Sequence, residues 1–434
     1  MFARKWWLCI VATLAALSTV SAQESRGFYK DLFMDSGVRL TSTRDLPSAR
    51  LLGLSMEMFV AADKGKETKI DSIMQANLIT GSAIDENGIL LYPDGQPRFR
   101  MVYMNGGSAG SHGTSLAKSG RARYQQFVAN GGSYVGTCAG MYIASKGTIG
   151  GADDMTKKPY RNYLGIFPGW VHATNLKKSY TGMNLTKHSA LLRYYNFSGT
   201  QHVDSVRHNG GCFGVTNIEW PSETEILATY ETDTMKNLKT DIQGKPSIIA
   251  YKANDKMGRI VLCGSHPEAI TTGDRLELMA AMVRYALDGT GKPVVKAQLT
   301  PDVTREMTKS TSDSVPAYTK IGDKQYHHFT VDVPSDVKTM TIELRPIENL
   351  DKYDVYLFAN PQEMAFRDNA THRNMTLGMT KDLVVNKPKK GTWYLSVFCD
   401  TTVDEVVTAF GTQYTGRVDV LNGVPYYITV RMTK

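Results

Sequence analysis

The sequence predicts an α/β protein in which a parallel β-sheet with helices on both faces is followed by an all-β sandwich domain. Strand-like apolar runs alternate with helical periodicity up to about residue 290, which is the pattern of a parallel sheet with covering helices. Beyond residue 317 the pattern changes to short alternating strands separated by turn residues, as in a β-sandwich. A length of 434 residues is sufficient for two or three domains.

Residues 1–22 have the pattern of a secretory signal peptide. Arg4 and Lys5 precede an apolar run over residues 6–17, and small residues follow as far as Ala22. The apolar run is too short for a membrane span, and no other stretch approaches the required length. We therefore expect an exported protein, periplasmic or extracellular, with no membrane span.

Composition and cysteine content limit the classes of partner and cofactor that we expect for this protein. The formal net charge of +8 is spread along the chain without a basic stripe, so we expect no nucleic-acid partner. Four cysteines lie beyond the signal peptide, at Cys138, Cys212, Cys263 and Cys399. A Cys212–Cys263 disulfide and free buried thiols are both compatible with this spacing. No CxxC or CxxxH spacing occurs, and we expect no metal site.

The α/β domain begins with elements that lead to a glycine-rich loop. Residues 23–48 are polar and mixed and are interpreted as a lead-in. The predicted elements that follow are strands at residues 51–60, 88–92 and 100–104 and helices at residues 67–78 and 116–129.

The glycine-rich loop at residues 105–113 follows a strand, where open α/β sheets place their ligand sites. Its backbone N–H groups are candidate oxyanion donors, together with the N–H of Ala139. Phosphate binding is disfavoured because the loop lacks the Lys-Ser/Thr ending of a P-loop and the GxGxxG spacing. A flexible surface loop is the alternative.

Residues 131–145 (GGSYVGTCAGMYIAS) have the layout of a nucleophile elbow: a β-prone run, a sharp turn and a helix-compatible run. Cys138 occupies the nucleophile position, and Gly136, Ala139 and Gly140 supply the small neighbours that so tight a turn requires. The N–H groups and the dipole at the start of the helix favour the thiolate. A small buried cysteine in a glycine-rich turn is the alternative that this stretch alone leaves open.

A second group of candidate site residues follows the last predicted strand of the sheet. Residues 146–205 form a long insertion that we expect to build a wall or lid over the site. The predicted elements beyond it are strands at residues 226–230, 247–251 and 260–263 and a helix at residues 274–287. His266 and Glu268 follow the last of these strands, and the extended backbone before Pro267 places both side chains on one face. A histidine that transfers a proton and a carboxylate that orients it are the partners that a nucleophilic cysteine requires.

Residues 291–317 are rich in Thr, Ser and Lys and are interpreted as a linker to the sandwich domain at residues 318–434. The predicted sandwich strands are residues 326–331, 339–344, 355–358, 382–385, 392–398, 406–411 and 426–430. Asp351 and Asp354 are weak candidates for a calcium site. His327 and His328 are expected on the surface of a strand.

Four motifs together resemble a known domain type. GTCAG with a distant SHPE resembles the class I glutamine amidotransferase-like superfamily, and YMNGGSA, GGSYVGTCAGMYIAS, LGIFPG and GSHPE resemble the N-terminal domain of biotin–protein ligases. The resemblance covers roughly residues 48–290 and implies a flavodoxin-like sheet. The C-terminal region resembles, less specifically, a small β-sandwich appended to secreted bacterial peptidases.

The resemblance also implies roles for individual residues. Cys138 corresponds to the nucleophile, His266 to the base and Glu268 to the orienting acid. The implied oxyanion donors are Gly106, Gly107 and Ala139. The chain contains neither a ligase catalytic domain nor a synthase domain to receive ammonia, and an exported protein lacks ATP. Biotinylation and glutamine-dependent synthesis are therefore poor interpretations.

The sequence thus predicts an exported cysteine-dependent hydrolase that cleaves an amide or peptide bond and needs no cofactor. Its substrate would be a small molecule, a peptide or a cell-envelope component. The alternative is a non-catalytic protein with an amidotransferase-like ligand pocket and a β-sandwich adhesion module. A carbohydrate-active enzyme is a weaker idea, because no pair of carboxylates stands in a suitable context.

Overall fold

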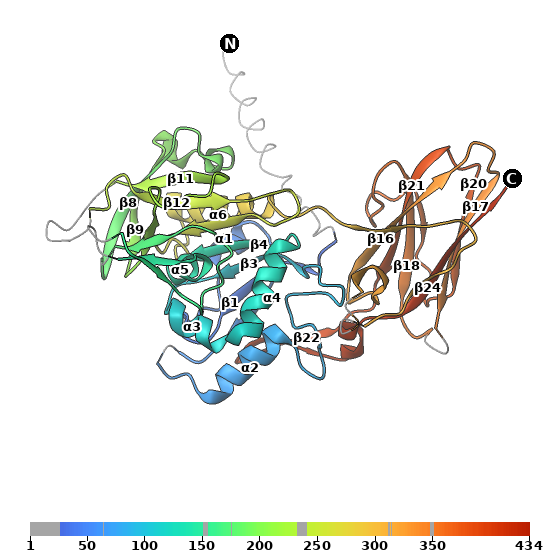
Figure 1. Cartoon of the computed structure of the whole chain (residues 1–434), viewed down its shortest axis with the longest axis horizontal. Coiled ribbons are helices and arrows are strands. Elements are labelled where there is room, and N and C mark those ends of the chain that lie inside the picture. The colour runs from blue at the N-terminus through green and yellow to red at the C-terminus, as the bar shows by residue number, and fades with distance from the viewer. Residues whose placement is uncertain are drawn as a thin grey trace, which may run out of the picture.

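The computed structural model describes residues 27–434 apart from residues 64, 151–154, 175, 232–240, 311–312, 314 and 348–350. The predicted signal peptide at residues 1–22 lies outside the described residues. An α/β part and a β-rich part lie side by side, with the C-terminus in the β-rich part (Figure 1). None of the described helices is both long enough and apolar enough to cross a membrane.

An eleven-stranded mixed sheet forms the centre of the α/β part. Its strands, from edge to edge, are β22 (Asp404–Thr408), β23 (Gly411–Thr415), β2 (Met56–Val60), β1 (Lys30–Ser36), β3 (Phe99–Met104), β4 (Ser133–Thr137), β13 (Ile260–Cys263), β12 (Pro246–Tyr251), β11 (Thr224–Tyr230), β8 (Ser179–Leu185) and β9 (His202–His208). The strands from β2 to β13 run parallel, and β12, β11, β8 and β9 extend the sheet in antiparallel fashion. The parallel strands follow the 2-1-3-4-5 order of a flavodoxin-like sheet. The predicted α/β class with a parallel sheet is confirmed.

Helices cover both faces of this sheet because successive strand residues alternate between two cores. The helices are α1 (Pro47–Leu51), α2 (Lys69–Thr80), α3 (Ala109–Ser115), α4 (Ala117–Ala129), α5 (Ala139–Ala144) and α6 (Gly273–Leu287). Leu32 and Met34 of β1 face a core that they share with α1 and α6. Phe33 faces a second core, which it shares with α2, α3, α4 and α5. The three helices expected from periodicity are present, with ends within two residues of the predicted ones.

The interpretation of residues 23–48 as a lead-in is wrong, because they contain β1, a central strand of the sheet. Two acidic residues made this strand resemble a polar segment. Asp31 pairs with Arg100 at 3.1 Å, and Asp35 pairs with His112 at 3.1 Å. A carboxylate is tolerated in a buried strand when donors satisfy its oxygens, and a pattern based on apolar runs misses such a strand.

Two other expected strands differ in detail. The strand predicted at residues 51–60 is shorter, because α1 ends at Leu51 and β2 begins only at Met56. Residues 88–92 form turns with one isolated bridge, between Leu91 and Pro97.

The insertion after α5 adds a small second sheet and the far edge of the large one. The small sheet has the order β10 (Cys212–Gly214), β7 (Val171–Ala173), β5 (Gly147–Ile149) and β6 (Lys157–Pro159). The 3₁₀ helices η1 (Ala190–Arg193) and η2 (Phe197–Gly199) lie between β8 and β9. The insertion therefore places β8 and β9 beside the sheet edge that carries the site described below.

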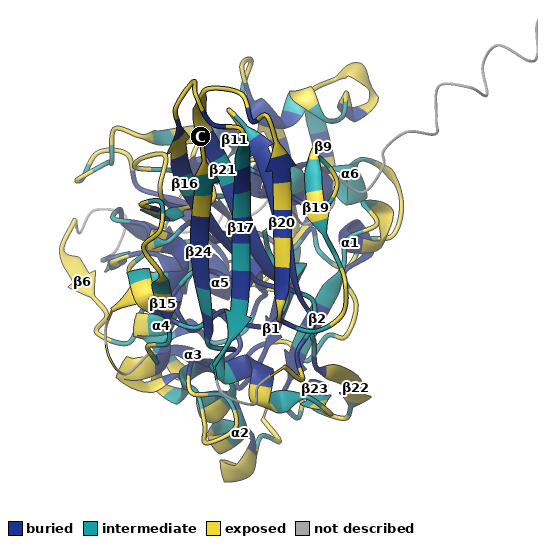
Figure 2. Ribbon diagram, turned by 90° about the vertical axis from the view of Figure 1, so that its right-hand side faces the viewer, coloured by how far each residue is buried: buried dark blue, intermediate teal, exposed yellow. Residues whose placement is uncertain are grey.

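Two sheets form the β-rich part and enclose one core. One consists of β14 (Val295–Gln298), β16 (Tyr326–Val333), β21 (Gly391–Cys399), β18 (Val355–Pro361) and β19 (His372–Asn374). The other consists of β15 (Arg305–Met307), β24 (Tyr426–Thr433), β17 (Thr339–Pro346) and β20 (Lys381–Asn386). Figure 2 shows the outer face of the second sheet, where buried and exposed residues alternate along β20. Alternation of this kind is expected of a strand with one face toward a core.

The predicted linker and sandwich boundaries need correction. Residues 291–317 contain β14 and β15, which belong to the two C-terminal sheets. Residues 406–411, expected to form one sandwich strand, instead span the turn between β22 and β23. This hairpin pairs with β2, through Phe59 and Gly411, and so covers an edge of the large sheet that would otherwise present unpaired backbone groups.

Two weaker expectations in the β-rich part are also resolved. His327 and His328 lie on β16 but are buried, with exposed fractions of 0% and 2%, so the expected surface position is wrong. Asp351 accepts hydrogen bonds from the N–H groups of residues 379 and 380, and Asp354 accepts one from Gly378. These carboxylates therefore stabilise a loop. Within the described parts of the chain, no group of three or more His, Cys, Asp or Glu side chains could hold a metal ion.

Candidate active site

Cys138 lies in a strained turn between β4 and α5. Its φ of 49° and ψ of −104° are outside the regions that a non-glycine residue normally adopts, at a cost of about 1–3 kcal/mol. A Cβ atom on Gly136 would lie 2.6 Å from the backbone of Gly140, and one on Gly140 would lie 2.3 Å from the carbonyl oxygen of Met104. The expectation that this turn requires small neighbours is confirmed.

His266 and Glu268 follow β13, which pairs in parallel with β4. Because Thr137 is aligned with Cys263, the residues that follow these two strands emerge at the same sheet edge. The N–H of Cys138 donates to the carbonyl of Cys263 at 2.9 Å, and the N–H of His266 donates to the carbonyl of Arg207 at 2.8 Å. These bonds fix both backbone segments in position.

The side chains of the three predicted residues line the same cavity, and two of them are hydrogen-bonded to each other. His266 Nδ1 lies 2.9 Å from Glu268 Oε1. Burial alone would lower the pKa of His266, but the interactions with Cys138 and Glu268 outweigh it and raise this pKa to about 10. The imidazole is therefore protonated at neutral pH.

The glycine loop after β3 packs directly on the histidine. A Cβ atom on Gly106 would lie 2.3 Å from Cε1 of His266. Gly107 forms an antiparallel bridge with Leu40, closed by hydrogen bonds from Thr41 N–H to Gly106 O and from Ser108 N–H to Arg39 O. In a bridge of this type the N–H of Gly107 points away from Leu40. Ala139 is the first residue of α5, so its N–H has no acceptor within the helix.

A cavity of about 460 Å³ opens over these residues. The predicted residues Gly107, Cys138, His266 and Glu268 line it, as does Asn105 at the start of the loop, whereas Gly106 and Ala139 are not among the lining residues. The lining residues not singled out by the sequence are Thr41, Thr43, Asp45, Tyr180, Arg207, Asn209, Ala269, Ile270 and Arg275. Oε2 of Glu268 is buried and has no hydrogen-bond partner among the described residues.

The connection between β9 and β10 forms one wall of the cavity and is held by a buried histidine. Ser265 donates to Nδ1 of His208 (2.7 Å), Nε2 of His208 donates to Thr174 (2.6 Å), and Thr174 donates to the carbonyl of Gly211 (3.0 Å). This direction follows because a carbonyl oxygen can only accept. Burial and the nearby charge of His266 lower the pKa of His208 to about 4, so this ring is neutral. The fixed wall places the carbonyl oxygen of Asn209 3.8 Å from Cys138 Sγ.

Cysteine pairing is resolved for the described residues. Cys138, Cys212, Cys263 and Cys399 are all free and buried, so the Cys212–Cys263 disulfide that the sequence allowed is not formed. Burial raises the pKa of the Cys212, Cys263 and Cys399 thiols. Among the four, Cys138 alone lines the cavity at the sheet edge.

The site residues missed by sequence interpretation come from the N-terminal lead-in, from the insertion and the strand that ends it, and from the segment after Glu268. Tyr180, Arg207 and Asn209 belong to β8, β9 and the turn after β9, which the antiparallel extension brings to the site. The only local signal was the segment VRHNGGCF at residues 206–213, whose turn residues followed a strand-like run.

Comparison with known proteins bears on the α/β part. Residues 83–287 match the family described as "Biotin-protein ligase, N terminal". This stretch is similar to that domain. The predicted resemblance is thus confirmed for these residues, and with the order of the parallel strands it supports an amidotransferase-like fold. No curated protein matches the chain.

Solved structures match at low identity. A glutamine amidotransferase has 16% identity and a TM-score of 0.29, with 43% of this chain and 80% of that chain covered. PliG of Aeromonas hydrophila, a periplasmic inhibitor of g-type lysozyme, has 14% identity and a TM-score of 0.19, with 32% of this chain and 100% of that chain covered. The GH42 β-galactosidase Gan42B has 11% identity and a TM-score of 0.26, with 84% of this chain and 40% of that chain covered.

Proposed function

We propose that the protein is an exported, cysteine-dependent hydrolase that cleaves an amide or peptide bond. The observation that carries the proposal is that Cys138 and the hydrogen-bonded pair of His266 and Glu268 line one open cavity. Export rests on the signal-peptide pattern of residues 1–22. The β-rich part, which resembles a domain appended to secreted peptidases, would hold the substrate, a cell-envelope polymer or another domain.

The reaction follows from the protonation states. The Cys138 thiolate attacks the carbonyl carbon, and the oxygen of the tetrahedral intermediate accepts hydrogen bonds from the N–H groups of Gly106, Gly107 and Ala139. The imidazolium of His266 gives its proton to the leaving nitrogen as the carbon–nitrogen bond breaks, which leaves a thioester on Cys138. His266, now neutral, takes a proton from water as the water attacks the thioester. The acid product leaves, and the thiolate–imidazolium pair is restored.

The reactivity of the cysteines tests this proposal. We expect iodoacetamide to alkylate Cys138 at least tenfold faster than Cys212, Cys263 or Cys399 at neutral pH, because thiolate is the reactive form and burial disfavours it at the other three. Peptide mapping by mass spectrometry against time gives the four rates, with Cys138→Ala as the control. Equal rates at all four cysteines would count against an activated nucleophile.

The alternative function is a non-catalytic ligand-binding pocket, and the low exposure of Cys138, at 4%, favours it. A sulfur enclosed by the cavity wall can contact a ligand without attacking it. Under this alternative a Cys138→Ala protein retains full ligand binding and full biological activity. Under the hydrolase proposal the same variant binds substrate but releases no amine. An amine-reactive fluorophore measures the amount of amine released.

A further inference from the structure

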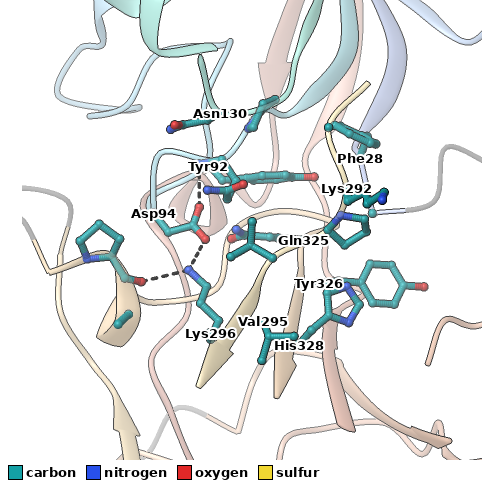
Figure 3. A pocket seen from close by; sticks show the side chains of 18 residues that line it. Phe28, Tyr92, Asp94, Asn130, Lys292, Val295, Lys296, Gln325, Tyr326 and His328 are labelled. Atoms are coloured by element: carbon teal, nitrogen blue, oxygen red, sulfur yellow. Dashed lines mark hydrogen bonds and ion pairs between the residues drawn. The ribbon is translucent and has the colours of Figure 1, made fainter. Parts of the chain in front are cut away.

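A second cavity, of about 190 Å³, lies between the α/β part and the β-rich part and shares no lining residue with the candidate active site. Figure 3 shows side chains from both parts around it. Phe28 and Tyr92 come from the α/β part. Val295 lies on β14, His328 lies on β16, and Gln325 directly precedes β16. A molecule bound there would contact both parts at once.

The buried charges in this cavity are already paired within the protein, and the third charged lining residue, Lys292, has an 85% exposed side chain. Asp94 forms an ion pair with Lys296, and their side chains are 0% and 8% exposed. Asp94 also accepts a hydrogen bond from the N–H of Gln96 (3.0 Å), and Lys296 donates to the carbonyl of Pro316 (3.0 Å). Burial and the charge of Lys296 lower the pKa of His328 to about 3, so that ring is neutral. A charged ligand would lose its hydration without gaining a buried counter-charge, because Lys292 is exposed and solvent screens its charge. An uncharged ligand avoids this cost.

Two polar groups at the cavity are left without partners. Tyr92 is 1% exposed, and its hydroxyl has no hydrogen-bond partner among the described residues. Figure 3 shows its ring lying across the cavity, with the hydroxyl toward Phe28 and Lys292. Gln325 accepts a hydrogen bond from the N–H of Gly322 (2.7 Å), and its amide nitrogen donates to no described residue. A buried hydroxyl without a partner costs stability, and a ligand with hydroxyl groups offsets this cost because it can both donate and accept.

The remaining lining is aromatic and the space is small. The rings of Tyr326 and His328 are stacked with centroids 5.7 Å apart and planes 8° apart, and Phe28 lies nearby in the same cavity. The volume corresponds to about six water molecules, which is also the scale of one sugar ring. Flat aromatic surfaces pack against the C–H faces of such a ring, while its hydroxyls reach the polar groups.

We propose that this cavity binds a single uncharged sugar residue, free or at the end of a glycan, through the Tyr92 hydroxyl, the Gln325 amide and the aromatic wall. The proposal is independent of the hydrolase chemistry, because none of these residues lines the other cavity. Under this proposal the junction between the two parts binds a sugar with residues that neither part supplies alone.

The experiment titrates the whole mature protein with glucose, galactose, N-acetylglucosamine and glucuronate, by saturation-transfer NMR and calorimetry. We expect at least one uncharged sugar to bind and glucuronate to bind more weakly. Tyr92→Phe is expected to weaken the binding about fivefold, the value of one net hydrogen bond, while the melting temperature stays equal or rises. Cys138→Ala is expected to leave sugar binding unchanged.

Two matched variants make the result decisive. Val295→Phe fills the cavity and is expected to abolish sugar binding, whereas Tyr160→Phe changes an exposed tyrosine of the α/β part and is expected to have no effect. The proposal is overturned if none of the uncharged sugars binds at tens of millimolar. It is equally overturned if glucuronate binds best, or if Tyr92→Phe and Val295→Phe both bind as tightly as the unaltered protein. The first outcome would leave the cavity as a water-filled gap, the second would make it a site for an anion, and the third would place the sugar elsewhere on the protein.

Discussion

At the scale of single residues, the candidate site depends on the environment of one imidazole. His266 contacts Cys138, Glu268 and the backbone of Gly106, and each contact affects either its protonation or its position. By contrast, His112 pairs with the buried Asp35 and is itself 0% exposed, so this second histidine–carboxylate pair has a structural role. A His–carboxylate pair is therefore informative only together with a nucleophile and a cavity.

Loss of the Glu268 charge should lower the pKa of His266. In Glu268→Gln we expect the imidazole to titrate well below the value of about 10 in the unaltered protein, because one hydrogen bond to a carboxylate and its charge are removed. NMR of labelled histidine side chains measures both values. A folded pKa above the ordinary value contributes stability that is present below about pH 6.5 and is lost as pH rises toward 10. The stability difference between the two proteins should shrink over that window, and a constant difference would contradict the assignment.

Gly106 tests the position of the same imidazole. Gly106→Ala would place a methyl group 2.3 Å from Cε1 of His266, so the ring must move away from Cys138. We expect the alkylation rate of Cys138 to fall about tenfold or more, because a misplaced catalytic group loses much of its effect. Gly110→Ala is the control, since its nearest atom would be 3.7 Å away, an ordinary contact. Equal rates in the two variants would show that the glycine does not set the histidine position.

At the scale of elements, the connection from β9 to β10 links the insertion to the sheet edge that carries the candidate site. His208 holds this connection through Ser265 and Thr174, and its lowered pKa of about 4 keeps the ring neutral. The described residues 207–212, at the end of the insertion, therefore form a fixed wall of the site. The sequence predicts a wall or lid here, but it does not show the polar network that fixes this wall.

The neutral state of His208 predicts a loss of stability in acid. In the unfolded chain this side chain takes up a proton near pH 6.5, but in the folded protein only near pH 4. The unfolded state binds more protons between these values, so the free energy of unfolding falls as pH falls across this window, by up to about 3 kcal/mol for this residue. Urea denaturation of His208→Asn at several pH values should show a correspondingly smaller fall. His188→Asn, at an exposed histidine, is the control and should follow the unaltered protein.

The residues predicted for the site share a simple origin, because each follows a parallel strand. Cys138 follows β4, His266 follows β13 and Gly106 follows β3, and carboxyl ends of neighbouring parallel strands meet at one edge. Tyr180 and Arg207 lie on antiparallel strands, whose position in the sheet depends on long-range pairing that no local pattern encodes. Local sequence patterns also fail to predict β1, where buried ion pairs replace the apolar pattern, and the hairpin of β22 and β23.

At the scale of the whole molecule, the two parts are joined by more than a linker. The hairpin of β22 and β23 leaves the β-rich part and extends the large sheet. Arg98 of the α/β part forms a 3.0 Å ion pair with Asp323, with side chains 3% and 1% exposed. Its guanidinium also lies over the rings of Tyr29 and Tyr414, 4.4 Å and 5.2 Å from their centroids. Such a buried and polar contact is inconsistent with two domains that move independently.

This junction predicts that the two parts unfold together. We expect one cooperative transition in scanning calorimetry of the intact chain, because separating the parts would expose both the edge of β2 and the buried charges of the junction. Asp323→Ala leaves the guanidinium of Arg98 buried without its carboxylate, which should cost about 3–5 kcal/mol and lower the transition temperature or divide the transition in two.

The matched control is Glu343→Ala, which removes a carboxylate from the more exposed pair with Arg431, where side chains are 19% and 54% exposed. Its effect should remain within about 1 kcal/mol, because solvent already screens that pair. Two separate transitions in the unaltered protein would show that the parts are energetically independent, and equal effects of the two substitutions would show that the Arg98–Asp323 pair does not couple them. One transition that only Asp323→Ala disrupts would instead mean that the junction is part of a single folding unit, whose stability depends on charges contributed from both sides.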